Sequence, residues 1–166
     1  SKWYSTSPPD FKFSAKVPKA ITHFKKFNEC ERMLDDFYSS AQNGLQHKLG
    51  CILFQLPPQL VYSEELLQRI INSLNPAFKN VIEFRHASWW NKFVFAELKK
   101  NKIIFSGISY PNLPDEVIQT NTNLYYRLHG VPVLYKSAYS ENFLETLTGE
   151  LHTREIKEAW IYLSNA

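Results

Sequence analysis

Apolar and polar residues follow one another in blocks that predict strands and helices in turn. Residues 11–17 alternate apolar and polar side chains, as a half-buried strand does. Short, mostly apolar runs typical of strands buried on both faces follow at residues 52–56, 81–85, 103–108, 124–128 and 160–163. The sequence therefore predicts about six strands.

Helical patterns separate these strands. Residues 29–49 carry apolar side chains at helical spacing, and Ser63 is placed to cap a second helix that has Glu64 and Glu65 in its first turn. We expect Ser88 to cap a third helix over about 89–100, which ends in two lysines as the helix dipole favours. A fourth helix is predicted over about 142–151, with three leucines facing inward.

This order of elements implies parallel strands joined by helical crossovers. The chain contains only five glycines and no glycine-rich phosphate loop, which argues against a dinucleotide-binding fold. A complete TIM barrel has eight strands and typically about 250 residues. We therefore predict an α/β fold, a TIM-type (β/α) barrel that is incomplete in this chain, with residues 1–166 forming a single domain and both ends appearing cut.

Composition narrows the class of protein. Apolar residues make up 44% of the chain and aromatic residues 15%, so we expect a globular protein. The formal charge of +3 permits an anionic ligand without requiring one. Cys30 and Cys51 have no metal-ligand spacing and are interpreted as buried thiols in a reducing, cytoplasmic environment. No apolar run is long enough to span a membrane, and we expect no membrane among the binding partners. The sequence leaves the oligomeric state open.

Three predicted strands end in polar, ionisable residues. The segments are Leu53-Phe54-Gln55-Leu56-Pro57-Pro58, Val81-Ile82-Glu83-Phe84-Arg85-His86 and Tyr125-Tyr126-Arg127-Leu128-His129-Gly130. A strand core does not need Glu, Arg or His, because burying such groups costs several kcal/mol unless they are paired. The repeated pattern indicates one shared site.

These same segments carry a family resemblance over nearly the whole chain. The matching stretches begin at Trp3 and include Pro9-Asp10-Phe11-Lys12-Phe13-Ser14-Ala15-Lys16, residues 21–23, 54–58, 83–89 and 126–130, and Tyr135, Tyr139 and Ser140. The chain resembles the YecE-like family, domain of unknown function 72. The resemblance implies a TIM-type barrel but no reaction. The family's opening strands are absent here, and Ser164-Asn165 stands where the family usually has paired asparagines.

In a TIM barrel the carboxyl ends of the strands form the active face. We expect the following residues near that rim: Lys16, Gln55, Glu83, Arg85, His86, Arg127, His129 and Asn165. Side chains alternate along a strand, so Glu83 and Arg85 should share one side, as should Arg127 and His129. Phe84 and Leu128 would then face the helices.

These residue types favour an anion site. Arg85 and Arg127 offer planar donor forks for phosphate or carboxylate, with Lys16, Gln55 and Asn165 as further ligand contacts. Glu83 with His86 or His129 would serve as acid and base, in a reaction of hydrolase or isomerase type. An aromatic cluster near the same loops would stack on a base or sugar ring: Trp89, Trp90, Tyr135 and Tyr139, with Tyr110 after another strand. We predict binding of an anionic, ring-bearing small molecule or a nucleic acid.

Other interpretations remain open. Glu83 and the arginines would also form a purely structural ion-pair network that braces the barrel mouth. A divalent metal held by Glu83, His86, His129 and His23 is a weaker alternative, because no metal-binding spacing is present; we predict no metal and no cofactor. Neither Ser88 nor Ser140 has the sequence context of a nucleophile. A non-catalytic nucleic-acid-binding module is the main competing function.

Overall fold

Three parallel strands form the centre of each of two units in this computed structural model, which describes residues 1–164. Unit 1 is Ser1–Arg85, and unit 2 begins at His86. In unit 1, β2 pairs with β1 and with β3; in unit 2, β5 pairs with β4 and with β6. All four pairings are parallel, so each pair needs a crossover connection, which is helical except between β4 and β5, where residues 110–122 form a loop.

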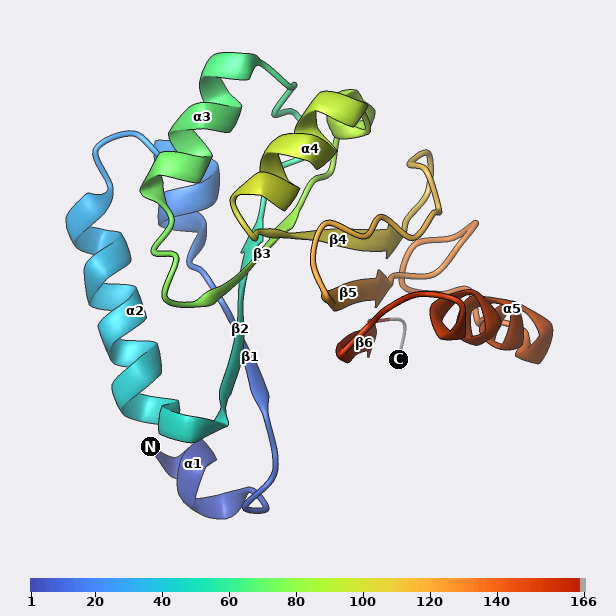
Figure 1. Ribbon diagram of the computed structural model, residues 1–166, viewed down its shortest axis with the longest axis horizontal. Helices are drawn as coiled ribbons and strands as arrows, with labels where there is room; N and C mark the ends of the chain where they lie inside the picture. The colour runs from blue at the N-terminus through green and yellow to red at the C-terminus, as the bar shows by residue number, and fades with distance from the viewer. Residues whose placement is uncertain (165–166) are drawn as a thin grey trace. The chain divides into compact units, whose positions relative to one another are not determined.

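Unit 1 alternates strands with helices (Figure 1). Its elements are α1 (Lys2–Thr6), β1 (Phe13–Lys16), a π-helical turn (Ala20–Lys25), α2 (Glu31–Leu45), a 3₁₀ turn (Gln46–Lys48), β2 (Leu49–Gln55), α3 (Glu64–Ser73) and β3 (Lys79–Glu83). Figure 1 shows α2 running beside β2 in the direction opposite to the strand, as a crossover between parallel neighbours requires.

The helix α3 shows how local sequence sets an element. The Ser63 hydroxyl accepts a hydrogen bond from the Leu66 N–H at 3.2 Å, which confirms the predicted cap. Glu64 and Glu65 occupy the first turn, where their charge favours the positive end of the helix dipole. Leu66, Leu67 and Ile70 are buried on the inner face, so the capping and the apolar stripe predict the same helix.

The core of unit 1 is built on β2, whose Ile52, Leu53 and Phe54 are all buried. Burial on both faces is expected when helices cover a parallel sheet. Tyr38 of α2 stacks on Phe78, with ring centroids 4.5 Å apart. Both cysteines are buried free thiols, as predicted.

Unit 2 continues the alternation. Its elements are a 3₁₀ turn (Ala87–Trp89), α4 (Lys92–Lys100), β4 (Ile104–Ser109), β5 (Asn123–Leu128), α5 (Glu141–His152) and β6 (Glu158–Leu163). The hydroxyl of Ser140 caps α5 by accepting from the Phe143 N–H at 3.2 Å. In unit 2, the ends of the helices and strands differ from the predicted ones by at most two residues, except at the start of α4.

The core of unit 2 lies between β5 and α5. Leu124, Tyr126 and Leu128 point to one side of β5 and cluster with Leu147 of α5. The prediction that Leu128 faces the helices is therefore confirmed. Gly107 of β4 lies so close to Tyr126 that an added Cβ would be 2.4 Å from the ring, so this strand position requires glycine.

The prediction that Ser88 caps a helix over 89–100 is wrong. The His86 side chain caps the short turn Ala87–Trp89 by accepting from the Ser88 N–H at 3.2 Å. The helix α4 begins later, at Lys92, and its cap is Asn91, whose side-chain oxygen accepts from the Val94 N–H at 3.0 Å. The two residues that act as caps, His86 and Asn91, are close together in the sequence. Trp89 lies between them and is fully buried, and the helix that follows is shorter than predicted.

A second difference concerns the start of the chain. The sequence pattern did not predict α1, and it gave no reason to bury a lysine. Lys48 is nevertheless buried, and its ammonium donates to the main-chain oxygens of Tyr4 and Ser7 at 2.7 and 2.9 Å. Three donors on one ammonium group suit this role, because they hold several oxygens at once.

The fold class agrees with the one predicted from the sequence. The described residues contain six strands, parallel within their sheets, that alternate with helices in the order expected of an incomplete TIM-type barrel. The α/β prediction is thus confirmed. The prediction of a single domain over 1–166 is not tested by the division into two units and stays a prediction.

Candidate functional site

In unit 1, predicted site residues lie at the carboxyl ends of adjacent strands. Lys16 ends β1, Gln55 ends β2 and Glu83 ends β3. Gln55 and Glu83 are register partners, so the ends of β2 and β3 are level. The Lys16 ammonium donates a hydrogen bond to the Gln55 side-chain oxygen at 2.6 Å. The structure therefore brings Lys16 and Gln55 together, as the site prediction requires.

Glu83 and Arg85 form a buried ion pair. The Arg85 Nε donates to Glu83 Oε1 at 2.5 Å, and an Nη of the same guanidinium contacts the same oxygen. The side chains are only 5% and 0% exposed for Arg85 and Glu83. The predicted shared orientation of this pair is confirmed. Removed from water, the two charges interact far more strongly than an exposed pair does.

His23 lies beside the same group of charges. It belongs to the π-helical turn after β1, and its Nδ1 is 2.8 Å from the Thr22 hydroxyl. Partial burial lowers the pKa of His23, and the positive charges of Lys19, Lys16 and Arg85 lower it further. A neutral imidazole is thus favoured by burial first and then by the three positive charges at this edge of unit 1.

Two of these residues were absent from the predicted site. His23 was considered only as a metal ligand, and Lys19 was not considered at all. The available signal was the segment Pro18-Lys19, which follows β1 directly. A loop that leaves the carboxyl end of a strand starts at the rim, so its first charged residues are candidates for the site.

In unit 2, the first predicted residues have local structural roles. Nδ1 of His86 accepts from the Ser88 N–H and lies 2.8 Å from the Ser88 hydroxyl. Any proton of the neutral imidazole therefore lies on Nε2. Trp89 is fully buried, so its ring is not presented to a ligand as the prediction supposed. The acid–base role predicted for His86 stays a prediction.

The carboxyl end of β5 holds the remaining described candidates. Arg127 is half-buried, and one of its Nη atoms is 3.4 Å from the Ser164 hydroxyl. His129 is buried, and its ring makes edge contacts with Tyr110 and Tyr135 at centroid distances of 5.7 and 5.8 Å. Two tyrosine rings therefore frame the imidazole.

The loop after β5 is fixed by main-chain geometry. Gly130 has φ +90°, and a Cβ there would lie 3.1 Å from the Val133 oxygen. The Tyr139 hydroxyl accepts from the Gly130 N–H at 2.8 Å, and its ring packs on Phe143. Tyr139 thus supports the loop, while Tyr135, with φ +60° and 51% exposure, presents its ring to solvent.

A polar network next to β5 was missed by the sequence analysis. The Asp115 carboxylate accepts hydrogen bonds from the hydroxyls of Ser109, at 2.6 Å, and Tyr126. Burial raises the pKa of Tyr126, and the hydrogen bond to Asp115 raises it further, so this phenol remains protonated. The loop between β4 and β5 was recognised only as a turn-rich segment.

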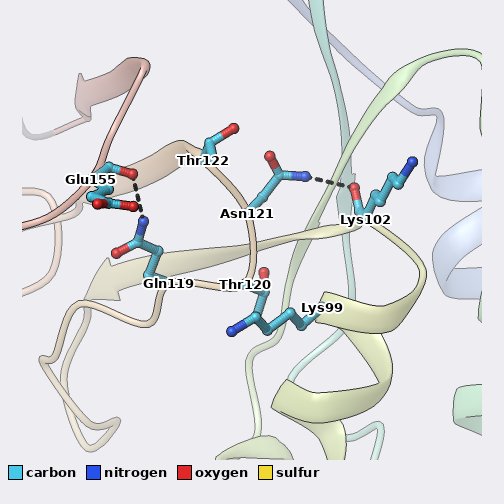
Figure 2. Close-up of a pocket in the computed structure, with 7 residues that line it drawn as sticks. All are labelled: Lys99, Lys102, Gln119, Thr120, Asn121, Thr122 and Glu155. Carbon is cyan, nitrogen blue, oxygen red and sulfur yellow. Dashed lines mark hydrogen bonds between the residues drawn. The ribbon is translucent and has the colours of Figure 1, made fainter.

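One predicted residue, Asn165, lies outside the described residues. Within residues 1–164, no group of three or more His, Cys, Asp or Glu side chains is arranged to hold a metal ion. The cavity of about 640 Å³ shown in Figure 2 belongs to unit 2 and contains none of the predicted site residues. It lies near the amino ends of the strands, opposite to the predicted rim.

No helix among the described residues is long and apolar enough to cross a membrane.

Comparisons with known proteins agree with the fold. A DUF72 family protein from Thermotoga maritima superposes with a TM-score of 0.88 at 24% identity, over 99% of this chain and 71% of that one. A DUF72 family protein from Enterococcus faecalis gives a TM-score of 0.82 at 22% identity, over 99% and 75%. No curated protein matches significantly. The sequence profile of the family described as "protein of unknown function DUF72" matches residues 1–166, and the chain therefore belongs to that family.

Proposed function

We propose that this protein binds an anionic, ring-bearing ligand at the carboxyl ends of its strands. A phosphorylated sugar, a nucleotide or a nucleic-acid strand has the required chemistry. The observation that carries the proposal is the cationic edge of unit 1, which we define as Lys16, Lys19, His23 and Arg85. These residues follow or end β1 and β3, at the strand ends where barrel proteins bind ligands.

The charge balance of this edge supports an anion. Lys16, Lys19 and Arg85 supply three positive charges, and the Glu83 carboxylate paired with Arg85 offsets one of them. Burial lowers the pKa of His23, and the positive charges of Lys19, Lys16 and Arg85 lower it further, so these three cations lie close enough to act on one ring. Lys16 and Lys19 are exposed, so a phosphate would reach their ammonium groups without a rearrangement of the core.

The ring of the ligand requires an exposed aromatic surface. Phe24 of the π-helical turn in unit 1 follows His23 directly and is 80% exposed, so it fits this role better than the predicted Trp89 and Tyr139. Trp89 is fully buried, and Tyr139 holds Gly130. The roles predicted for Arg127 and His129 stay predictions.

The test measures the binding of AMP, and of its two halves adenosine and inorganic phosphate, by calorimetry and NMR. We expect AMP to bind and adenosine to bind much more weakly. Replacing both Lys16 and Lys19 by Ala should weaken AMP binding about tenfold or more, because charge-assisted contacts are each worth roughly 1.5–3 kcal/mol. Bound phosphate should also raise the pKa of His23, because it neutralises the surrounding positive charge.

Lys79→Ala is the matched control, since Lys79 is exposed and opens β3 at the opposite end of the same unit. If this variant weakens AMP binding as much as the Lys16 and Lys19 replacement, binding is non-specific and the proposal fails. If AMP does not bind but single-stranded DNA does, with a steep dependence on salt, the protein is a nucleic-acid-binding module.

A further inference from the structure

A cavity of about 640 Å³ in unit 2 lies near the amino ends of β4, β5 and β6 (Figure 2). Its walls come from the last turn of α4 and from three connections: the one between α4 and β4, the one that leads into β5, and the one that leads into β6. The lining residues are all polar or charged: Lys99, Lys102, Gln119, Thr120, Asn121, Thr122 and Glu155. Cavities of this size hold small molecules.

Hydrogen bonds fix the walls relative to one another. The Asn121 side-chain N–H donates to the Lys102 main-chain oxygen at 2.8 Å, and the Gln119 side-chain N–H donates to that of Glu155 at 3.0 Å. Figure 2 shows both bonds. Buried Thr120 donates to the Ile103 oxygen at 2.7 Å and accepts from the Phe105 N–H at 2.9 Å. The cavity is therefore bounded by connections that are already held in place.

Three charged residues line the cavity: Lys99, Lys102 and Glu155. In the described residues, the structure records no ion pair for the Lys99 ammonium or the Glu155 carboxylate, although both line the same cavity. Their neighbours are paired instead: Lys100 with Glu97 at 3.8 Å, and Arg154 with Glu150. Figure 2 shows the Lys102 side chain extending to the far side of Asn121, away from Gln119 and Glu155.

We propose that this cavity binds a small zwitterion, a molecule with one carboxylate and one ammonium group such as a free amino acid. The carboxylate would pair with Lys99 and the ammonium with Glu155. The Gln119 side-chain oxygen and the Thr122 hydroxyl belong to residues that also line the cavity and offer further hydrogen bonds. A ligand with one sign of charge would satisfy only one of the two charged groups.

This site is separate from the proposed anion site. It belongs to unit 2 and to the amino ends of the strands, whereas the cationic edge belongs to unit 1 and to the carboxyl ends. Because Lys99 and Glu155 are exposed, their charges are screened by water, and we expect binding in the millimolar range.

The experiment is an NMR titration of the whole chain with glycine, β-alanine, 4-aminobutyrate and 6-aminohexanoate. These probes differ in the separation of their charged groups. We expect the backbone amides of residues 119–122 to shift, with one length binding best. Acetate and methylamine, which each carry one charge, should bind several-fold more weakly than that best probe.

Variants assign the two charges. Lys99→Ala and Glu155→Gln should each weaken the best probe about fivefold, and the double exchange Lys99→Glu with Glu155→Lys should restore much of the affinity because the zwitterion can bind reversed. Lys100→Ala is the control that should leave the affinity unchanged. AMP binding at unit 1 should be unaffected by all of these variants.

Three results would overturn the proposal. One is the absence of saturable shifts with every zwitterion. Another is acetate or phosphate binding as tightly as the best zwitterion, which would make the cavity an anion site. The third is equal loss of affinity in the Lys99 and Lys100 variants, which would indicate a general charge effect rather than a site.

Discussion

Different interactions hold the polar side chains at the strand ends of the two units. In unit 1, the end of β3 buries a full ion pair between Glu83 and Arg85. In unit 2, the side chains after β4 and along β5 meet in a network of hydroxyls around one carboxylate, Asp115, which lies at the exposed surface. A buried charge pair is costly to assemble, whereas hydroxyl groups are held by ordinary hydrogen bonds.

The difference indicates where ligand chemistry belongs. A structural bond between neutral groups would hold a loop in place at lower cost, as Tyr139 does for Gly130. Unit 1 instead retains a guanidinium beside two exposed lysines and a neutral imidazole. Charge kept at a functional edge despite its desolvation cost favours a binding role for unit 1 and a supporting role for the network of unit 2.

The largest effect is expected from Arg85→Ala. This change removes the cation beside a fully buried carboxylate and should lower the free energy of unfolding by about 3–5 kcal/mol. Urea unfolding of the variant measures the loss. The matched control is Arg69→Ala, which breaks the i,i+4 pair with Glu65, whose side chain is 85% exposed, and should cost only about 0.3–0.5 kcal/mol.

Equal losses for Arg85→Ala and Arg69→Ala would contradict this comparison of buried and exposed charge. Replacing both members of the buried pair, Glu83→Leu with Arg85→Met, should be less destabilising than Arg85→Ala alone, because no uncompensated charge is left inside.

An intermediate effect is expected in the core of unit 2. Gly107→Ala would place a Cβ 2.4 Å from the Tyr126 ring, which is buried and bonded through its hydroxyl to Asp115. Overpacking of this kind should cost about 1–3 kcal/mol, measured as a lower free energy of unfolding. Gly149→Ala in α5 is the control, because nothing lies within 4 Å of its added Cβ. It should stabilise by roughly 0.5–1 kcal/mol, since alanine favours helix more than glycine does. Destabilisation by both changes would show that the Tyr126 contact is not the cause.

The smallest effect concerns pH. The pKa of His23 is lowered in the folded protein from an ordinary value of about 6.5, so the unfolded chain binds more protons just below that pH. Stability contributed by His23 is therefore complete above about pH 6.5 and falls as the pH drops toward the lowered value. His23→Gln should remove this part of the pH dependence, which urea unfolding between pH 7 and pH 5 would measure. An identical pH dependence in the variant and the parent would show that folding does not lower the pKa of His23.

Local sequence predicted the elements well where two signals agreed. Ser63 with its apolar stripe defined α3, and the apolar run of β2 defined a strand buried on both faces. Alternation also placed Glu83 with Arg85 and turned Leu128 toward α5. Prediction failed at Ser88, because His86 and Asn91 also offer cap acceptors and sequence does not rank them.

The site itself was predictable only in part. Lys16, Gln55, Glu83 and Arg85 were predicted at or near strand ends because polar residues there are conspicuous in an apolar pattern, and the structure places them there. Lys19, His23 and Asp115 lie in loops, whose path depends on contacts that sequence spacing does not encode. Trp89 was predicted to present its ring to a ligand, but it is fully buried. The reason is the same, because the burial of a side chain depends on residues that are distant in the sequence.

By itself, then, the sequence determined the α/β class, the order of elements and the residues at the strand ends, because these follow from periodicities of about 2 and 3.6 residues along the chain. Only the tertiary structure decided which charges pair, that Lys48 is buried, and that Lys99 and Glu155 line one cavity. Such contacts join residues far apart in the chain. The energies of these contacts depend on the distance between the charged groups and on the exclusion of water, and local sequence patterns specify neither.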